Sequence, residues 1–138
     1  MARQPRVPEP EGLNAEFYAR AHAGVLHLQR CVSCGRFRHP PRYYCADCGS
    51  PEVEWVPSPG RGRLVSWTVS HFPLDRGWAE ELPYATVVVE LDEGVRVIGA
   101  VEGVATAALE PGLQLEASLE PMAETFTFIT FRPIPPTD

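Results

Sequence analysis

Four cysteines carry the clearest chemistry in this sequence of 138 residues. They form two Cys-x-x-Cys pairs, and a glycine directly follows each pair. Two thiolates three positions apart can face one metal ion when a tight turn, which glycine permits, brings both sulfur atoms inward. Four thiolates complete a tetrahedron that favours zinc and leaves no coordination position for water. The spacing predicts one structural zinc ion held by Cys31, Cys34, Cys45 and Cys48.

The same four thiolates are compatible with two other kinds of chemistry. Iron in this cage would make a rubredoxin-like electron carrier, and an exposed dithiol could exchange with disulfides. Paired cysteines of this spacing in a reducing compartment point to metal rather than to disulfides. Zinc is therefore the main prediction, and the iron protein remains the alternative.

A basic loop lies between the two cysteine pairs and carries Arg36, Arg38 and Arg42. Two prolines stiffen this loop, and guanidinium groups suit bidentate contacts to phosphate or carboxylate. We expect the three arginines to bind a small anion or a partner and to contribute little to stability. The alternative is that they only solvate the ribbon and offset the charge of a zinc–thiolate centre.

The sequence contains the residue types of a hydrolase triad, but their spacing does not suit one. Ser66, Ser70, His71 and Asp75 include the members of a hydrolase triad. Strand alternation places the serines on one face and His71 on the other, and no strand–turn–helix elbow holds a serine. We therefore predict no catalytic residue in this chain.

The elements that position the cysteines begin with a short helix over residues 13–23. Leu13, Phe17 and Ala21 recur at a spacing of four and would share one face, and Asn14 is the expected N-cap. Residues 25–31 then alternate as a strand that delivers Cys31 to the ribbon.

Beyond residue 62 the hydrophobic period changes to two, which is typical of strands. The turn Asp92-Glu93-Gly94 is a strong hairpin signal, because glycine tolerates a positive φ. Five short strands within such a length favour a small closed barrel of the OB type. The expected strands cover residues 63–72, 84–91, 95–101, 112–121 and 124–133.

The predicted fold is mostly β: a short N-terminal helix, a rubredoxin-like four-cysteine zinc ribbon and an OB-fold β-barrel. The expected boundaries are 1–23 for the N-terminal arm and helix, 24–60 for the ribbon and 61–138 for the barrel. On the last strand, Phe126 and Phe128 share one face while Phe131 lies on the other. Because both faces of this strand cannot be core, we expect one set to be exposed for an assembly contact. Trp78 lies in a polar loop, where it would either anchor a partner or pack back on its own barrel.

Charge is distributed unevenly along the chain. Residues 1–63 carry nine arginines against six acidic residues, and residues 64–138 carry three against twelve. An acidic barrel would repel a phosphate chain, so the nucleic-acid-binding ribbon and OB module is an alternative that charge disfavours. No apolar run approaches the roughly 20 residues of a membrane-spanning helix, and the N-terminus lacks the apolar core of a secretion signal. We expect a cytoplasmic protein with no nucleic-acid or membrane partner.

Several motifs together resemble one known family. They are L-x4-C-x2-C-G, PPR at 40–42, the second C-x2-C-G, Trp55, GRGRLVSWTVSH at 60–71, PYATVVVELDEGVRVIG at 83–99 and FRPI at 131–134. Over residues 12–134 the chain resembles the OB-fold and zinc-ribbon acyl-CoA-associated proteins, domain of unknown function family thirty-five.

The resemblance implies an accessory subunit without activity of its own. Its partner would be a thiolase-fold enzyme of the sterol-carrier-protein type, such as an aldolase or acyltransferase acting on steroid or fatty acyl-CoA, or a MaoC-like hydratase. It implies a heterotetramer in which the partner supplies the catalytic residues and a CoA ester binds through the complex. The residues that we expect to contact CoA or the partner are Arg36, Arg38, Arg42 and Trp78.

Overall fold

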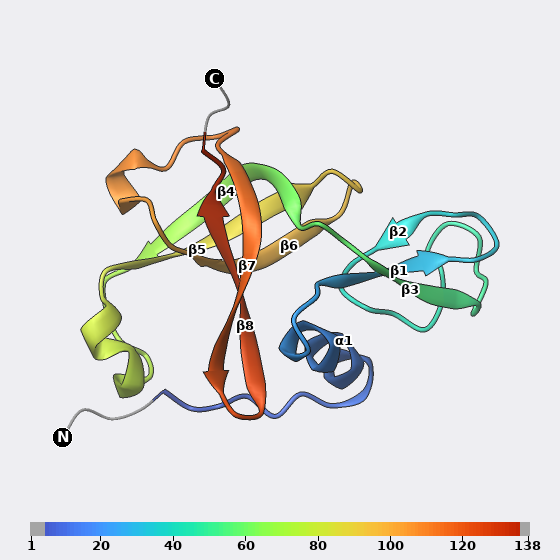
Figure 1. Cartoon of the computed structure of the whole chain (residues 1–138), viewed down its shortest axis with the longest axis horizontal. Helices are drawn as coiled ribbons and strands as arrows, with labels where there is room; N and C mark the ends of the chain where they lie inside the picture. The colour runs from blue at the N-terminus through green and yellow to red at the C-terminus, as the bar shows by residue number, and fades with distance from the viewer. Residues whose placement is uncertain (1–4, 136–138) are drawn as a thin grey trace.

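The computed structural model describes residues 5–135, which form a three-stranded ribbon, one helix and a five-stranded barrel (Figure 1). The helix α1 spans Gly12–His22 and lies between the ribbon and the barrel. The ribbon strands are β1 His27–Cys31, β2 Phe37–Arg38 and β3 Val53–Pro57, in the order β2-β1-β3. The barrel strands are β4 Arg61–Ser70, β5 Tyr84–Leu91, β6 Arg96–Val101, β7 Gln114–Ala123 and β8 Phe126–Pro133.

The five barrel strands close in the order β4-β5-β6-β8-β7. All neighbours are antiparallel except β6 and β8, which are parallel and pair only through Ala100 with Thr130 and Val101 with Phe131. The predicted hairpin joins β5 to β6, with Gly94 at a φ of 91°. Two short 3-10 helices lie between strands, η1 Arg76–Glu81 and η2 Thr106–Ala108. The structure confirms the predicted fold class.

A β-bulge in β4 changes which alternate side chains of this strand face the barrel core. The register against β5 shifts between Leu64 and Ser66. Leu64 is fully buried before the bulge, and Trp67 and Val69 pack against the core after it. The extra residue moves the inward face by one position, so odd-numbered side chains continue the row that Leu64 begins.

Helix α1 begins earlier than the sequence predicted. Glu11 is the N-cap residue and makes no side-chain capping bond, whereas Asn14 lies inside the helix. The expectation that Asn14 caps the helix was wrong, because Gly12, at a φ of 59°, starts the first turn two residues before it. Phe17 and Ala21 are buried, as their spacing predicted.

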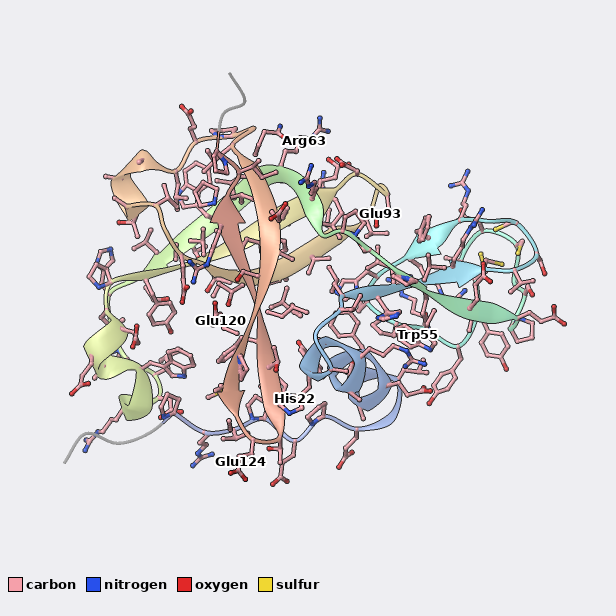
Figure 2. The ribbon with its side chains drawn as sticks, in the orientation of Figure 1. His22, Trp55, Arg63, Glu93, Glu120 and Glu124 are labelled. Carbon is pink, nitrogen blue, oxygen red and sulfur yellow. The ribbon has the colours of Figure 1, made fainter. Side chains whose placement is uncertain are left out.

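Side chains of helix α1 contact both the ribbon and the barrel. Arg20 places its guanidinium carbon 4.4 Å from the centre of the Trp55 ring, on ribbon strand β3. His22 donates from Nε2 to the carbonyl oxygen of Glu124 at 2.7 Å, and its Nδ1 lies 2.7 Å from Thr127 Oγ1. Figure 2 shows Trp55 on the ribbon side of the helix and His22 beside the β7–β8 turn that holds Glu124. The helix therefore joins the ribbon to the barrel.

A continuous row of aromatic rings follows the same path. Neighbouring ring centres lie between 4.8 and 5.8 Å apart. This aromatic row consists of His39, Phe17, Tyr18, Phe126, Phe128, Trp78 and Tyr84.

Both faces of β8 are therefore packed within the chain. Phe131 is fully buried, Phe126 is buried against Tyr18 of α1, and Phe128 is half-buried against Trp78 of η1. The expectation of an exposed phenylalanine set was wrong for Phe126, which α1 covers, whereas Phe128 packs against η1 and stays half-buried beside a cavity. Within residues 5–135, no helix is long and apolar enough to cross a membrane.

Candidate metal centre and its surroundings

The two cysteine pairs form matching turns. Gly35 donates its N–H to the carbonyl oxygen of Cys31 at 2.8 Å, and Gly49 donates to that of Cys45 at 2.9 Å. Both glycines have a φ near 80°, at 79° and 78°, which other residues rarely adopt. The glycine after each pair therefore makes the tight turn that the sequence indicated.

The four sulfur atoms suit a tetrahedral ion. They lie within 4.8 Å of one another, and the Cys31–Cys48 and Cys34–Cys45 pairs are each 3.6 Å apart. A zinc–sulfur bond of about 2.3 Å in a tetrahedron puts neighbouring sulfurs about 3.8 Å apart. The donor set and its spacing fit a structural zinc ion.

Backbone groups favour thiolates on the buried side of this cluster. The N–H of Cys34 is the main cause that lowers the pKa of Cys31. The N–H of Cys48 is the main cause that lowers the pKa of Cys45 to about 6. Because the thiolate is the form that ligates metal, these turns prepare both buried cysteines for binding.

The arginines of the intervening loop lie in three different environments. Arg38 donates from Nε to Gln29 Oε1 at 2.8 Å and from Nη2 to the carbonyl oxygen of Arg42 at 2.7 Å. The N–H of Arg42 also donates to Gln29 Oε1, at 2.8 Å. Gln29 is only 1% exposed, so Arg38 holds the loop onto β1 from inside the ribbon. Arg38 therefore stabilises the ribbon loop through these hydrogen bonds.

The other two arginines face solvent. Arg36 forms an exposed ion pair with Asp47 at 3.5 Å. Arg42 lines an open hollow of about 750 Å³ together with Tyr43, Tyr44 and the first residues of α1. The structure therefore does not gather the three arginines into one cluster.

Trp78 packs back on its own barrel. Its ring centre lies 5.4 Å from that of Phe128, edge to face, and 5.8 Å from that of Tyr84. The ring also lines a cavity beside β6, so it retains a half-buried face. The contacts agree with the second of the two sequence-based interpretations, in which Trp78 packs back on its own barrel. A partner contact at Trp78 stays a prediction.

The sequence did not single out three residues that now matter. Gln29 is a buried polar residue whose role depends on Arg38 and on the loop backbone. Tyr43 and Tyr44 are 67% and 66% exposed, an unusual state for neighbouring aromatic residues on a ribbon. Their adjacency to Arg42 was a signal that could have identified the hollow.

Family comparisons match nearly the whole fold. The ChsH2 rubredoxin-like zinc ribbon domain matches residues 19–54, and the ChsH2 C-terminal OB-fold domain matches residues 55–120. A chain of the Ltp2-ChsH2(DUF35) aldolase superposes with a TM-score of 0.84 at 32% identity. That match covers 92% of this chain and 98% of the other.

Two longer proteins are also similar. A probable enoyl-CoA hydratase alpha subunit from Thermomonospora curvata is 33% identical over 91% of this chain. The 3-oxo-4,17-pregnadiene-20-carboxyl-CoA hydratase alpha subunit of Mycobacterium tuberculosis is 34% identical over 75% of it. The chain spans 39% and 32% of the length of these two relatives, so it corresponds to one part of each.

Proposed function

The chain belongs to the ChsH2 (DUF35) family of zinc-ribbon and OB-fold proteins, and from that premise we propose that it is a non-catalytic accessory subunit of an acyl-CoA enzyme complex. The observation that carries the proposal is the match over 92% of the chain to one chain of the Ltp2-ChsH2(DUF35) aldolase. Both hydratase relatives are also named as subunits that act on CoA esters. The partner is a thiolase-fold aldolase or acyltransferase, and its substrate is a steroid or fatty acyl-CoA.

The metal centre supports an accessory role. Cys31, Cys34, Cys45 and Cys48 would hold zinc with all four tetrahedral positions filled by sulfur. A metal in such a cage supplies folding energy and offers no position for a substrate or an activated water. The loop that carries Arg42 is held onto β1 by its hydrogen bonds to Gln29 and Arg38.

The hollow around Arg42 is the place where we propose contact with the CoA moiety. Its guanidinium is exposed, and the exposed rings of Tyr43 and Tyr44 lie beside it. A guanidinium suits phosphate, and aromatic faces suit a stacked adenine base. Arg36 is a weaker candidate because Asp47 pairs with it, and Trp78 is assigned to the partner instead.

Co-expression with a thiolase-fold chain tests the proposed function. We expect the two chains to elute together, as two copies of each, because a dimeric thiolase offers two equivalent surfaces. Light scattering would give the mass, and turnover of a steroid acyl-CoA would appear only with the complex. Separate elution of the two chains at micromolar concentration, or turnover by this chain alone, would contradict the proposal.

A test of the hollow uses Arg42→Ala within the complex and Arg63→Ala as its matched control. Arg63 is an exposed arginine on β4, ion-paired with Glu90 at 2.9 Å, and it does not line the hollow around Arg42. We expect Arg42→Ala to raise the KM for the CoA ester several-fold, with the difference shrinking at high salt. Equal KM values for the two variants would remove CoA binding from this hollow and leave the accessory role intact.

A further inference from the structure

An aromatic cavity of about 260 Å³ opens beside the place where β6 and β8 separate. Its wall is built from four aromatic rings, and small or aliphatic residues and one threonine complete the lining. The lining residues are Tyr18, Trp78, Tyr84, Ala85, Thr86, Ile98, Gly99, Ala100, Phe128 and Ile129. We call this feature the aromatic cavity.

The fold holds the cavity in shape. Asp75 caps η1, the yellow-green turn of Figure 1, by accepting the N–H of Gly77 at 2.9 Å. Trp78, in this turn, packs against Phe128 and Tyr84. Tyr18 enters from α1 and is fixed by its contact with Phe126. A Cβ at Gly99 would lie 2.5 Å from the carbonyl oxygen of Ile129, so a larger residue would displace β8. The cavity is therefore a consequence of three separate elements meeting.

The size of the cavity limits what it can receive. Sites for drug-sized ligands measure about 300–1,000 Å³. At about 260 Å³ the aromatic cavity falls just below that range, which favours a small apolar group over a whole CoA group. One apolar side chain or one ring is the appropriate occupant.

The rim is apolar and exposed. Ile98 lines the cavity and is 66% exposed, although it lies in the middle of strand β6. Apolar pockets with an exposed apolar rim are the usual receptors for the anchor residues of a protein partner. The rim thus favours an anchor side chain over a free small molecule.

Charge next to the cavity specifies the partner further. An adjoining hollow of about 570 Å³ shares the wall formed by Trp78 and Phe128. Three glutamates, Glu81, Glu102 and Glu120, line this hollow. No cationic residue is among the described residues that line it. Figure 2 labels Glu120 on the β7 side of this region.

The carboxylates of this hollow are only partly neutralised within the chain. Arg132 pairs with Glu102 at 2.8 Å and with Glu120 at 3.1 Å, so one cation serves two carboxylates. A cationic group of a partner would be attracted to the remaining negative charge.

We propose that the aromatic cavity receives an apolar anchor side chain from the partner subunit, and that a lysine or arginine next to this anchor enters the acidic hollow. The inference rests on the proposed accessory function and deepens it by assigning the docking surface. Because the two sites share the wall formed by Trp78 and Phe128, a short segment with a basic residue beside an apolar one can reach both.

The first experiment needs no partner protein. The zinc-loaded chain is titrated with the peptide Ac-Arg-Phe-Arg-NH2 while the indole N–H signals of its three tryptophans are followed by NMR. The Trp78 signal is assigned with Trp78→Phe. We expect this signal to move with millimolar affinity, and the peptide Ac-Glu-Phe-Glu-NH2 to move it at least about fivefold more weakly. An unmoved Trp78 signal, or an equal response to both peptides, would overturn the proposal.

The second experiment uses the complex with the thiolase-fold chain. Ile98→Arg fills the rim and repels a basic segment, so we expect its affinity for the partner to fall about tenfold or more. Val25→Arg is the matched control, because Val25 is an exposed β-branched residue, 44% exposed, outside both hollows. We expect the control to stay within about twofold of the wild-type affinity.

The outcomes separate the two proposals. If Ile98→Arg binds the thiolase-fold partner as tightly as wild type does, the proposed docking surface is refuted and the accessory function still stands. If the wild-type chain forms no complex, the accessory function is refuted. The peptide titration then tests by itself whether the aromatic cavity binds a basic–apolar segment.

Discussion

Replacing Arg38 with alanine should destabilise the ribbon, although Arg38 lies in a loop of basic residues. The change removes two hydrogen bonds from a half-buried guanidinium, one to Gln29 and one to the carbonyl oxygen of Arg42. Hydrogen bonds to charged groups contribute about 1.5–3 kcal/mol each, and partial solvent access reduces that contribution. We expect a loss of about 2–3 kcal/mol in the free energy of unfolding.

Thermal unfolding of the zinc-loaded protein measures this loss. For a chain of this length, 1 kcal/mol shifts the Tm by about 4 °C, so Arg38→Ala should melt about 8–12 °C below wild type. Arg36→Ala is the control, since its exposed ion pair with Asp47 contributes about 0–1 kcal/mol. Arg38→Lys should recover less than half of the loss, because an ammonium group lacks the fork that reaches both acceptors.

The result that refutes this reasoning is a Tm for Arg38→Ala within about 2 °C of that for Arg36→Ala, with zinc content unchanged. Such a result would mean that solvent replaces both hydrogen bonds at little cost. Arg38 would then be free to serve the binding role that its sequence context suggested.

Three further predictions concern the metal centre, the half-buried His39 and the barrel seam. Metal analysis should find one zinc per chain, and replacing Cys45 and Cys48 with serine should prevent soluble expression, so a folded, metal-free double variant would contradict the zinc role. Burial lowers the pKa of His39 to about 4, below its unfolded value of about 6.5, so its contribution to stability is complete above pH 6.5 and is lost as the pH falls toward 4. Between pH 7 and pH 5, denaturant unfolding should show wild type losing about 2 kcal/mol more than His39→Phe, and equal losses would refute this. Gly99→Ala should cost about 1–3 kcal/mol in denaturant unfolding, because its Cβ would lie 2.5 Å from the carbonyl oxygen of Ile129, and an unchanged midpoint would show that β8 yields freely.

The fold was largely predictable because its signals are local. The glycine after each cysteine pair, the period of two beyond residue 62 and the turn at Gly94 each determine a backbone conformation within a few residues. Residue types that require a particular φ identify turns without knowledge of the rest of the chain. The metal-ligand set was predictable for the same reason.

Features that depend on contacts between distant segments were not predictable. Phe126 and Phe128 looked like candidates for an assembly contact, because strand alternation alone does not reveal that α1 and η1 cover their face. Arg38 looked like its exposed neighbours, because its partner Gln29 lies on a different strand. The helix start was misplaced because a good capping residue at position 14 competes with a glycine that suits the preceding turn.

The aromatic row explains how a closed metal centre can matter to a surface on the far side of the chain. His39, in the ribbon loop, contacts Phe17, and the row continues through Tyr18 of α1, which forms one wall of the aromatic cavity. Buried residues of α1 and of the ribbon also belong to the same hydrophobic cluster as the barrel core. Packed interiors transmit displacement because they contain few voids. If the chain docks its partner through the aromatic cavity, as proposed above, a zinc ion that fixes the ribbon against α1 would support that contact without touching substrate.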